Sequence, residues 1–558
     1  MLINKRILFI LESPSKMKTI SSILKKMNVK NFRIVSTMGH IKDLPKDRFG
    51  LKIENGKIIP HFVFLPYKKK VLERIEKMLN NVDVVILATD PDREGEAISF
   101  HVFNELKKKF YNVDFKRAFI NEITFDGLKR GIENLGFINY SMVQSQFARR
   151  IIDRIIGYKI SPILWRNFKM RGLSAGRVQT ATLKLIYDKE KEIENFKPQK
   201  FYTIKIKFKV EDRIFEGYLY ENDQVLKFFD KDKLSEFKEK VLEKIVGKNL
   251  KFDLFENERE IIPPDPLKTS TLQQEAAKLG ISNSETMKIA QKLYEGVFVD
   301  NEKIGLITYH RTDSIRISQY GIDLAKKILG NVFIHKRKNK SMFDAHEAIR
   351  ITTDIDLEKV KKFLDRKEFL VYQLIYNRFL ASLSPVCRYL HFQLVCPIFK
   401  DICLKYESAL ILDKGFTKFL PEYLNLKIFK NEVLNTKAKL LEVLGYSIEE
   451  EQTKPPARYT LSSIVKKMEE VGIGRPSTYA STVEILKKRK YIEVKKGSIF
   501  ITDLGKKVIE FLFNLYPSFF SVDFTAHLED VLDKIENTQY EESQSLANKK
   551  IWEIYSVL

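Results

Sequence analysis

The sequence predicts a multidomain protein of the α/β and α+β classes, with a doubly wound sheet, helical domains that include a winged-helix-like part, and a β arch. Its 558 residues exceed what one hydrophobic core supports, so several domains are expected. The hydrophobic pattern also changes along the chain, from alternating strand and helix signals to long helical and then long strand signals. Hydrophobic residues make up 44% of the chain, which is enough to fill several cores.

Two proline pairs and the changes between strand and helix signals divide the chain. Pro263-Pro264 breaks it after the first strand-rich stretch, and Pro455-Pro456 opens the last segment. We expect six segments, in chain order a doubly wound domain (1–145), the first part of a helical domain (146–197), the first part of a β arch (198–266), a second helical domain (267–386), the second part of the arch (387–456) and the second part of the first helical domain (457–558).

The strand-rich stretches 201–255 and 389–443 bracket the second helical domain. We expect them to pair into one sheet that acts as an arch or hinge. In the last segment a helix, a turn over 472–477, a second helix and a hairpin follow in the order of a winged helix. This order favours a DNA-binding module, although helix-turn-helix geometry also serves packing alone.

Three acids, Asp90, Asp92 and Glu94, stand at alternate positions after an apolar run at 84–87. Carboxylates suit a hard cation such as Mg²⁺, but the acids alone fit a solvated loop equally well. Near the start, an apolar run ends at Glu12 and is followed by Lys16. Because open α/β sheets bind ligands at the carboxyl ends of their strands, these groups are expected to share one crevice. A phosphate flanked by Mg²⁺, a lysine and a spare carboxylate is the outline of a phosphoryl-transfer site.

This pattern resembles the TOPRIM domain of type IA DNA topoisomerases, although primases and nucleases with the same domain also fit it. Further motifs decide between them. The segment 305–314, Gly-Leu-Ile-Thr-Tyr-His-Arg-Thr-Asp-Ser, looks like the active-site segment of type IA topoisomerases, with Tyr309 at the nucleophile position and Arg311 after it. Other segments of the family recur in the expected order: 36–41, 147–154, 173–179, 345–350 and 474–479. The resemblance covers nearly the whole chain and implies a toroidal fold.

The resemblance also implies the chemistry. Tyr309 would attack a backbone phosphate of one DNA strand, form a 5′-phosphotyrosyl bond and release a 3′-hydroxyl. Arg311 would stabilise the charge of the transition state, and Glu12 would manage the proton of the departing oxygen. Lys16 would neutralise the phosphate. Four carboxylates would hold Mg²⁺: Glu12, Asp90, Asp92 and Glu94.

Contacts with a single strand through phosphate and sugar are implied for a larger set of residues. These are His40, Arg93, Arg149, Asp153, Ser174, Arg177, Gln179, Asp313, His346, Arg350, Arg475 and Ser477. Ser174 is also placed to cap the helix that follows it. His346 and Arg350 would share one face if their segment is helical. Alternatives remain for some of them: a packed or capped histidine for His346, a turn residue for His40, and for Arg311 an ion pair with Asp313.

The charge balance predicts a polyanionic partner. Lysine and arginine number 97 against 73 acids, a net charge of +24, so binding to DNA should weaken with salt; solubility and ion-pair networks are the alternative explanations. The three cysteines, Cys387, Cys396 and Cys403, form no Cys-x-x-Cys pair and fit ordinary buried residues of a reducing cytosol. We therefore expect no zinc. No P-loop, signal peptide or membrane-spanning run is present, so we expect no use of ATP and a location in the cytoplasm. We also expect a monomer.

Three departures from the family pattern leave the subclass open. His310 stands where bacterial relaxing enzymes usually have Met and decatenating relatives often have Pro, and in this it resembles the topoisomerase half of reverse gyrases. Ile351 stands where Pro is usual. Many bacterial relatives also carry zinc ribbons, for which the cysteines are missing. The first hypothesis is ATP-independent relaxation of negatively supercoiled DNA by single-strand passage. The alternatives are a topoisomerase subunit of a reverse-gyrase-like or decatenating assembly with a separate helicase, and a non-catalytic single-strand-binding protein.

Overall fold

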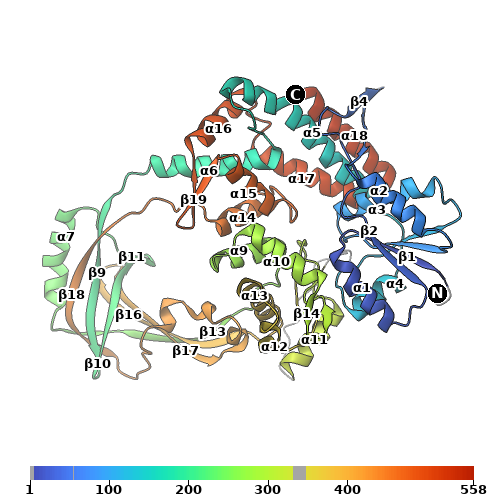
Figure 1. Cartoon of the computed structure of the whole chain (residues 1–558). Helices are drawn as coiled ribbons and strands as arrows, with labels where there is room; N and C mark the ends of the chain where they lie inside the picture. The colour runs from blue at the N-terminus through green and yellow to red at the C-terminus, as the bar shows by residue number, and fades with distance from the viewer. Residues whose placement is uncertain (1–4, 55, 331–346) are drawn as a thin grey trace.

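The computed structural model describes residues 5–54, 56–330 and 347–558, and its elements follow a ring (Figure 1). In this view the N-terminal sheet and its helices lie at the right, long helices run along the top, strands form the left side, and a group of short helices lies near the centre. The ring closes where α9 (Thr269–Lys278) packs against α14 (Leu461–Glu470). The fold class predicted from the sequence, including its toroidal arrangement, is confirmed.

The N-terminal domain is built on a parallel sheet with the strand order β2-β1-β7-β8. Alternate residues of β1 face opposite sides, because Phe9 packs into one core cluster with α1 whereas Leu8 packs into another with α2 and α3. Helices cover both faces, so the sheet is doubly wound. The elements are β1 (Ile7–Leu11), α1 (Ser15–Lys26), β2 (Phe32–Ser36), β3 (Lys42–Asp43), β4 (Leu51–Glu54), β5 (Lys57–Pro60), β6 (Val63–Phe64), α2 (Lys68–Met78), β7 (Val84–Leu87), α3 (Arg93–Lys107), β8 (Asp114–Arg117) and α4 (Phe125–Glu133).

The long helices at the top combine two distant parts of the chain. Ile155 of α5 and Leu528 of α17 belong to one core cluster, so residues after 457 complete the domain that α5 begins. Neither α5 nor any other helix in the described ranges is long and apolar enough to cross a bilayer. The elements are α5 (Tyr140–Phe168), α6 (Arg177–Glu194), α14, α15 (Tyr479–Lys488), β19 (Ile492–Lys495), β20 (Ser498–Ile501), α16 (Asp503–Leu515), α17 (Val522–Asn537) and α18 (Tyr540–Val557).

Two local predictions for this domain have different outcomes. The order helix, turn, helix and hairpin is present as α14, the 472–477 turn, α15 and the β19–β20 hairpin. The prediction that Ser174 caps α6 is wrong: Gly176 is the N-cap residue, without a side-chain cap. Ser174 Oγ instead accepts a hydrogen bond from Arg489 Nε at 3.0 Å, because the turn packs against the end of α15 rather than the start of α6.

The arch is one sheet made from both strand-rich stretches, with the order β12-β18-β9-β10-β17-β16-β13 and with β11 beside β10. The pairings of β10 with β17 and of β13 with β16 join the two stretches, as expected. Cys387 and Cys396 are buried on β16, Cys403 is partly buried on β17, and all three are free thiols. The elements are β9 (Lys200–Val210), β10 (Arg213–Glu221), β11 (Gln224–Val225), α7 (Lys231–Phe237), η1 (Lys238–Leu242), α8 (Glu243–Ile245), β12 (Asn249–Lys251), β13 (Asp253–Ile261), β16 (Cys387–Phe399), β17 (Ile402–Asp413), η2 (Gly415–Lys418), η3 (Pro421–Leu424), η4 (Lys427–Phe429) and β18 (Leu440–Gln452).

The central helical domain packs against one face of the N-terminal sheet. Phe9 of β1 and Leu272 of α9 belong to the same core cluster, so the two domains share a hydrophobic interface. Extended segments bring Ile307 opposite Ile351 across an antiparallel bridge beside this interface. The elements are α9, α10 (Asn283–Glu295), β14 (Val297–Val299), β15 (Glu302–Ile304), α11 (Gln319–Leu329), α12 (Leu357–Lys361) and α13 (Arg366–Ser382).

Candidate active site

A side-chain cap and a close backbone contact position the acidic loop after β7. Asp92 caps α3, since its Oδ1 accepts a hydrogen bond from the Gly95 amide at 2.8 Å. A Cβ atom at Gly95 would lie 2.1 Å from the carbonyl oxygen of Asp90, so only glycine allows the start of α3 to approach the strand end this closely. The loop therefore presents its carboxylates at the carboxyl end of β7, next to the end of β1.

A buried arginine, which the sequence analysis did not single out, also stabilises this loop through hydrogen bonds. Arg117, at the end of β8, is fully buried and donates from Nε to Glu96 Oε2 at 2.7 Å. Its other nitrogens donate to the carbonyl oxygens of Leu87 at 3.0 Å, Thr89 at 3.1 Å and Asp90 at 2.9 Å. An arginine at a strand end gives no sequence signal for this role, because its partners are mainly backbone carbonyls brought together by the sheet.

Glu12 and Lys16 lie at the end of β1 and in the first turn of α1. Lys16 is buried and forms an ion pair with Asp90, and burial lowers the pKa of its ammonium to about 8. Burial, and secondarily the charge of Asp92, raises the pKa of Glu12 to about 7. Glu12 Oε2 is buried and has no hydrogen-bond partner among the described residues. A carboxyl with this pKa exists in both protonation states near neutrality, as proton transfer requires.

Tyr309 reaches this acidic loop from the central domain. Its amide donates to the carbonyl oxygen of Asn121 at 2.7 Å, and only 3% of the residue is exposed. Its hydroxyl donates to Asp92 Oδ2 at 2.5 Å, and its ring packs edge-on against Tyr294. Burial, followed by the charge of Asp92, raises the pKa of Tyr309 well above its usual value, while Arg311 opposes the shift. In this conformation the tyrosine is therefore a neutral phenol.

Arg311 lies between the tyrosine and the carboxylates. Its Nη1 is 3.5 Å from Asp92 Oδ2 and 3.4 Å from Glu94 Oε2, so these acids, rather than Asp313, are its ion-pair partners. About a third of its side chain, 31%, remains exposed. A guanidinium next to the phenol and open to solvent on one side can receive a phosphate there.

The four predicted metal ligands gather at this place but form no ready-made metal site. Burial and then the charges of Asp92 and Glu94 raise the pKa of Glu12, while Lys16 and Arg311 oppose the shift. The oxygen-only donor set and the unpartnered oxygen of Glu12 fit Mg²⁺, which commonly takes one or two carboxylates and completes its shell with water and substrate phosphate. Within the described part of the chain, no three His, Cys, Asp or Glu side chains converge on one point. A bound phosphate would have to complete the site.

Two cavities meet at Arg311. The larger, about 1060 Å³, opens on Glu12, Asp90 and His310 and extends to Ser477 and α15. The other, about 340 Å³, runs between the start of α3, α5, the 475–478 turn and α17. Of the predicted catalytic residues, Arg311 lines both cavities and Glu12 lines the larger one.

Four of the predicted DNA-contacting arginines surround the smaller cavity or lie beside it, and all four pair with acids of α17. The contacts join Arg149 and Arg177 to Glu529, Arg93 to Asp533 and Glu536, and Arg475 to Asp530 and Asp533. Sequence analysis missed these acids. Glu529, Asp533 and Glu536 have the spacing of one face of a helix, which is visible in the sequence. The same pattern is typical of an ordinary solvated face.

The remaining predicted contacts lie at different distances from the catalytic groups. His40 Nε2 is 3.3 Å from Glu94 Oε1, Asp313 is exposed beside the smaller cavity, and Asp153 Oδ1 is 3.7 Å from Arg177 Nε. Gln179 is partly exposed in the first turn of α6. Ser174 lies apart from this group, against Arg489.

Arg350 does not reach the surface, which corrects its prediction as a direct DNA contact. Its guanidinium is fully buried and donates to Glu122 and Glu347, each at 2.9 Å. Its segment is extended, with Ile349 bridged to Leu267, so the helical face assumed for His346 and Arg350 is also wrong for the part that the structure describes. His346 itself lies outside the described residues.

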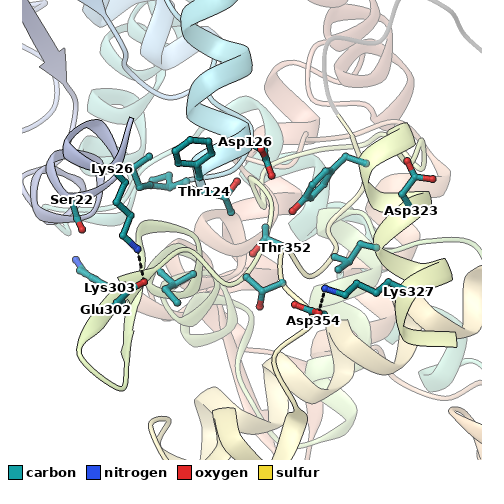
Figure 2. A pocket seen from close by; sticks show the side chains of 17 residues that line it. Ser22, Lys26, Thr124, Asp126, Glu302, Lys303, Asp323, Lys327, Thr352 and Asp354 are labelled. Carbon is teal, nitrogen blue, oxygen red and sulfur yellow. Dashed lines mark hydrogen bonds and ion pairs between the residues drawn. The ribbon is translucent and has the colours of Figure 1, made fainter. Parts of the chain in front are cut away.

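Figure 2 shows a separate cavity of about 480 Å³ between α1, α4, β15 and α11. Lys26 pairs with Glu302 at 2.7 Å across its edge, and Lys327 pairs with Asp354 at 2.5 Å. No predicted site residue lines it. It lies at the junction between the N-terminal and central domains.

Comparison with known proteins agrees with this geometry. The DNA topoisomerase family matches residues 137–547, and the Toprim domain matches residues 7–123. The chain belongs to the type IA DNA topoisomerase family. DNA topoisomerase 1 of Thermotoga maritima is 38% identical over 98% of this chain and 84% of its own length. The corresponding values for DNA topoisomerase 1 of Aquifex aeolicus are 37%, 95% and 95%. The structure of full-length topoisomerase I from T. maritima matches with a TM-score of 0.85 and 36% identity, over 99% of this chain and 90% of the other.

Membership of this family indicates which metal and which partner the Toprim domain binds. The domain generally binds Mg²⁺, so Mg²⁺ is the metal of this topoisomerase, and DNA is its partner. The hydrogen bond from the phenol of Tyr309 to the carboxylate of Asp92 joins the central domain to the Toprim domain at this site.

Proposed function

We propose that the chain relaxes negatively supercoiled DNA by cutting one strand, passing the other through the break and rejoining the ends. The observation that carries the proposal is the hydrogen bond from Tyr309 to Asp92, with Arg311 beside both. It places a nucleophile, a fixed positive charge and a carboxylate within reach of one phosphate. One phosphodiester is exchanged for another of similar energy, so the reaction needs no ATP and supercoil strain gives it direction.

In the cleavage step, Tyr309 Oη forms a bond to phosphorus and the bond from phosphorus to the 3′ oxygen breaks. The phenolic proton leaves along the hydrogen bond to Asp92 Oδ2. Glu12, protonated in part because its pKa is about 7, donates a proton to the departing 3′ oxygen. Arg311 stabilises the charge on the phosphate oxygens, and Lys16 leaves Asp90 to do the same. Rejoining reverses each transfer.

The carboxylates of Glu12, Asp90, Asp92 and Glu94 are the groups that would hold Mg²⁺. When bound, the ion supplies positive charge and orients the 3′-hydroxyl for rejoining. Lys16 and Arg311 pair with two of these carboxylates, Asp90 and Glu94. The Mg²⁺ requirement should therefore be stronger for rejoining than for DNA binding.

We also propose a cytoplasmic monomer without a resident zinc ion, organised in the six segments expected from the sequence. The three free cysteines lie on two neighbouring arch strands and form no cluster with further ligands among the described residues. The core clusters support the pairing of these segments, because the arch strands share one cluster and the two halves of the first helical domain share another.

Neither alternative function is favoured. A non-catalytic single-strand-binding protein needs no phenol aimed at an acidic loop. A subunit that requires a separate helicase is not suggested by relatives named DNA topoisomerase 1. His310 is buried beside Tyr309, and Ile351 lies in the bridge opposite Ile307, so both departures from the family pattern are packing positions around the nucleophile.

The test is a gel assay with purified protein and negatively supercoiled plasmid, without ATP, across a salt series. Wild type with Mg²⁺ should relax the plasmid stepwise, whereas Tyr309→Phe should not, although it still binds single strands. Chelation of Mg²⁺ should stop relaxation by wild type. Relaxation by Tyr309→Phe would refute the assignment of Tyr309 as the nucleophile. Dependence of relaxation by wild type on an added ATPase would favour the helicase-coupled assembly.

A further inference from the structure

The acids of α17 form two groups that differ in burial. Glu529 is fully buried between Arg149 and Arg177, which are themselves largely buried. Asp533 and Glu536 keep 35% and 19% of their side chains exposed and line the smaller cavity. The inner acid cannot turn to solvent without leaving two charges unpaired, whereas the outer acids can.

The outer acids contact the arginines as a phosphate would. Asp533 uses one oxygen for Arg93 and the other for Arg475, at 2.9 Å from Nε and 2.6 Å from Nη2 of the latter. Glu536 pairs with Nε of Arg93. Two guanidinium forks on two oxygens of one acid is the pattern with which arginines bind phosphate. The cavity that these groups line also reaches Arg311 and Asp92.

Positive groups remain for a ligand in this cavity. Arg149 Nε is buried without a hydrogen-bond partner in the described ranges, although its Nη2 pairs with Glu529. Arg311 is partly exposed at the other end. A backbone phosphate entering the cavity would meet these donors and, at the same time, the negative charges of Asp533 and Glu536.

We propose that Asp533 and Glu536 are internal phosphate substitutes: they hold Arg93 and Arg475 in place in the free protein and are displaced by a DNA phosphate when a single strand enters. Glu529 is the fixed positioning residue that stays with Arg149 and Arg177 in both states. The exchange lowers the affinity for single strands and so eases release of the strand after rejoining. This inference rests on the proposed function, since it concerns the strand that the enzyme cleaves.

The test measures binding of a fluorescently labelled single-stranded oligodeoxynucleotide by anisotropy, in the Tyr309→Phe background. Asp533→Asn combined with Glu536→Gln keeps the shape of both side chains and removes both charges. We expect the Kd to fall roughly three- to tenfold, because the arginines no longer have to leave internal partners. The slope of log Kd against log salt should become steeper by about one, because the freed acids of wild type take up cations that the variant does not.

A matched control removes two charges elsewhere. Asp523→Asn with Glu541→Gln changes exposed acids at the starts of α17 and α18, which pair with none of the four arginines in the described structure. It should change the Kd by less than about twofold, through long-range charge alone. Equal or weaker binding by the Asp533/Glu536 variant relative to this control would overturn the proposal, as would an unchanged salt slope.

A second variant guards against misfolding. Glu536→Gln alone removes the less exposed of the two acids and should give part of the same gain, with a thermal unfolding curve close to that of the parent. Because binding is read in the Tyr309→Phe background, the result does not depend on strand cleavage. Failure of wild type to relax plasmid would refute the proposed function and leave the binding result standing.

Discussion

Tyr309 and Asp92 lie 217 residues apart in the sequence, and the phenol of the first donates a hydrogen bond of 2.5 Å to Oδ2 of the second. Asp92 uses its other carboxylate oxygen to cap α3. The proposed nucleophile is thus aligned by an acid whose own position is set by the start of α3. A cation that enters the site has to compete with the phenol and with Arg311 for this acid.

Replacing Arg311 by alanine should reduce the rate of strand cleavage by about 10²- to 10³-fold, because the transition-state charge loses its nearest fixed donor. The cleavage rate of Arg311→Lys should lie between those of Arg311→Ala and wild type, because lysine keeps the positive charge but lacks the planar fork. Single-turnover cleavage of an end-labelled oligonucleotide measures both. Cleavage by Arg311→Ala at the wild-type rate would remove this residue from the mechanism.

Cleavage should depend on the protonation of Glu12. Its pKa is about 7, and the protonated form is the one that donates to the 3′ oxygen, so the cleavage rate should fall as the pH rises through about 7. Glu12→Gln should be slower by about 10²- to 10⁴-fold and should lose this pH dependence. The measurement is a pH profile of single-turnover cleavage. A profile of wild type that stays flat around pH 7 would assign the proton to another group.

Glu529 should make the protein sensitive to acid. Its pairing with Arg177 and Arg149 lowers its pKa from 4.5 to about 2 despite burial, so the carboxylate stabilises the folded state above pH 4.5 and this contribution is lost as the pH falls toward 2. Glu529→Gln should lower the free energy of unfolding by about 3 kcal/mol at neutral pH, and by little at the acid end. Urea unfolding at both pH values measures this, with exposed Asp523→Asn as the control. An equal loss of unfolding free energy at neutral and acid pH would contradict the lowered pKa of Glu529.

Gly95→Ala should disturb the acidic loop. The added Cβ would lie 2.1 Å from the carbonyl oxygen of Asp90, so the loop must shift at a cost of roughly 1–3 kcal/mol in stability. We expect a raised Mg²⁺ concentration for half-maximal relaxation, because the carboxylates move. Gly157→Ala in α5 is the matched control: its Cβ meets no atom within 4 Å, and alanine suits a helix better, so stability should rise slightly. If Gly95→Ala and Gly157→Ala show the same stability and the same Mg²⁺ concentration for half-maximal relaxation, the close approach at Gly95 is not needed for function.

Sequence reasoning succeeded where local pattern and chemistry act together. Apolar runs predicted β1 and β7, and parallel strands bring their carboxyl ends to one edge, so Glu12 and Asp90 were expected as neighbours. It failed where burial depends on distant segments. Arg350 resembles a surface cation in the sequence, but Glu122 and Glu347 neutralise it inside the interface between the domains.

By itself the sequence determined the classes of domain, the two strand stretches of the arch and the residue types that carry strand cleavage, because hydrophobic periodicity and side-chain chemistry are local properties. Only the tertiary structure decided that Tyr309 rests on Asp92 and that the acids of α17 hold Arg93 and Arg475. These contacts join residues 217, 440 and 58 positions apart in the sequence. They arise from tertiary packing within and between the domains, which no local pattern in the chain contains.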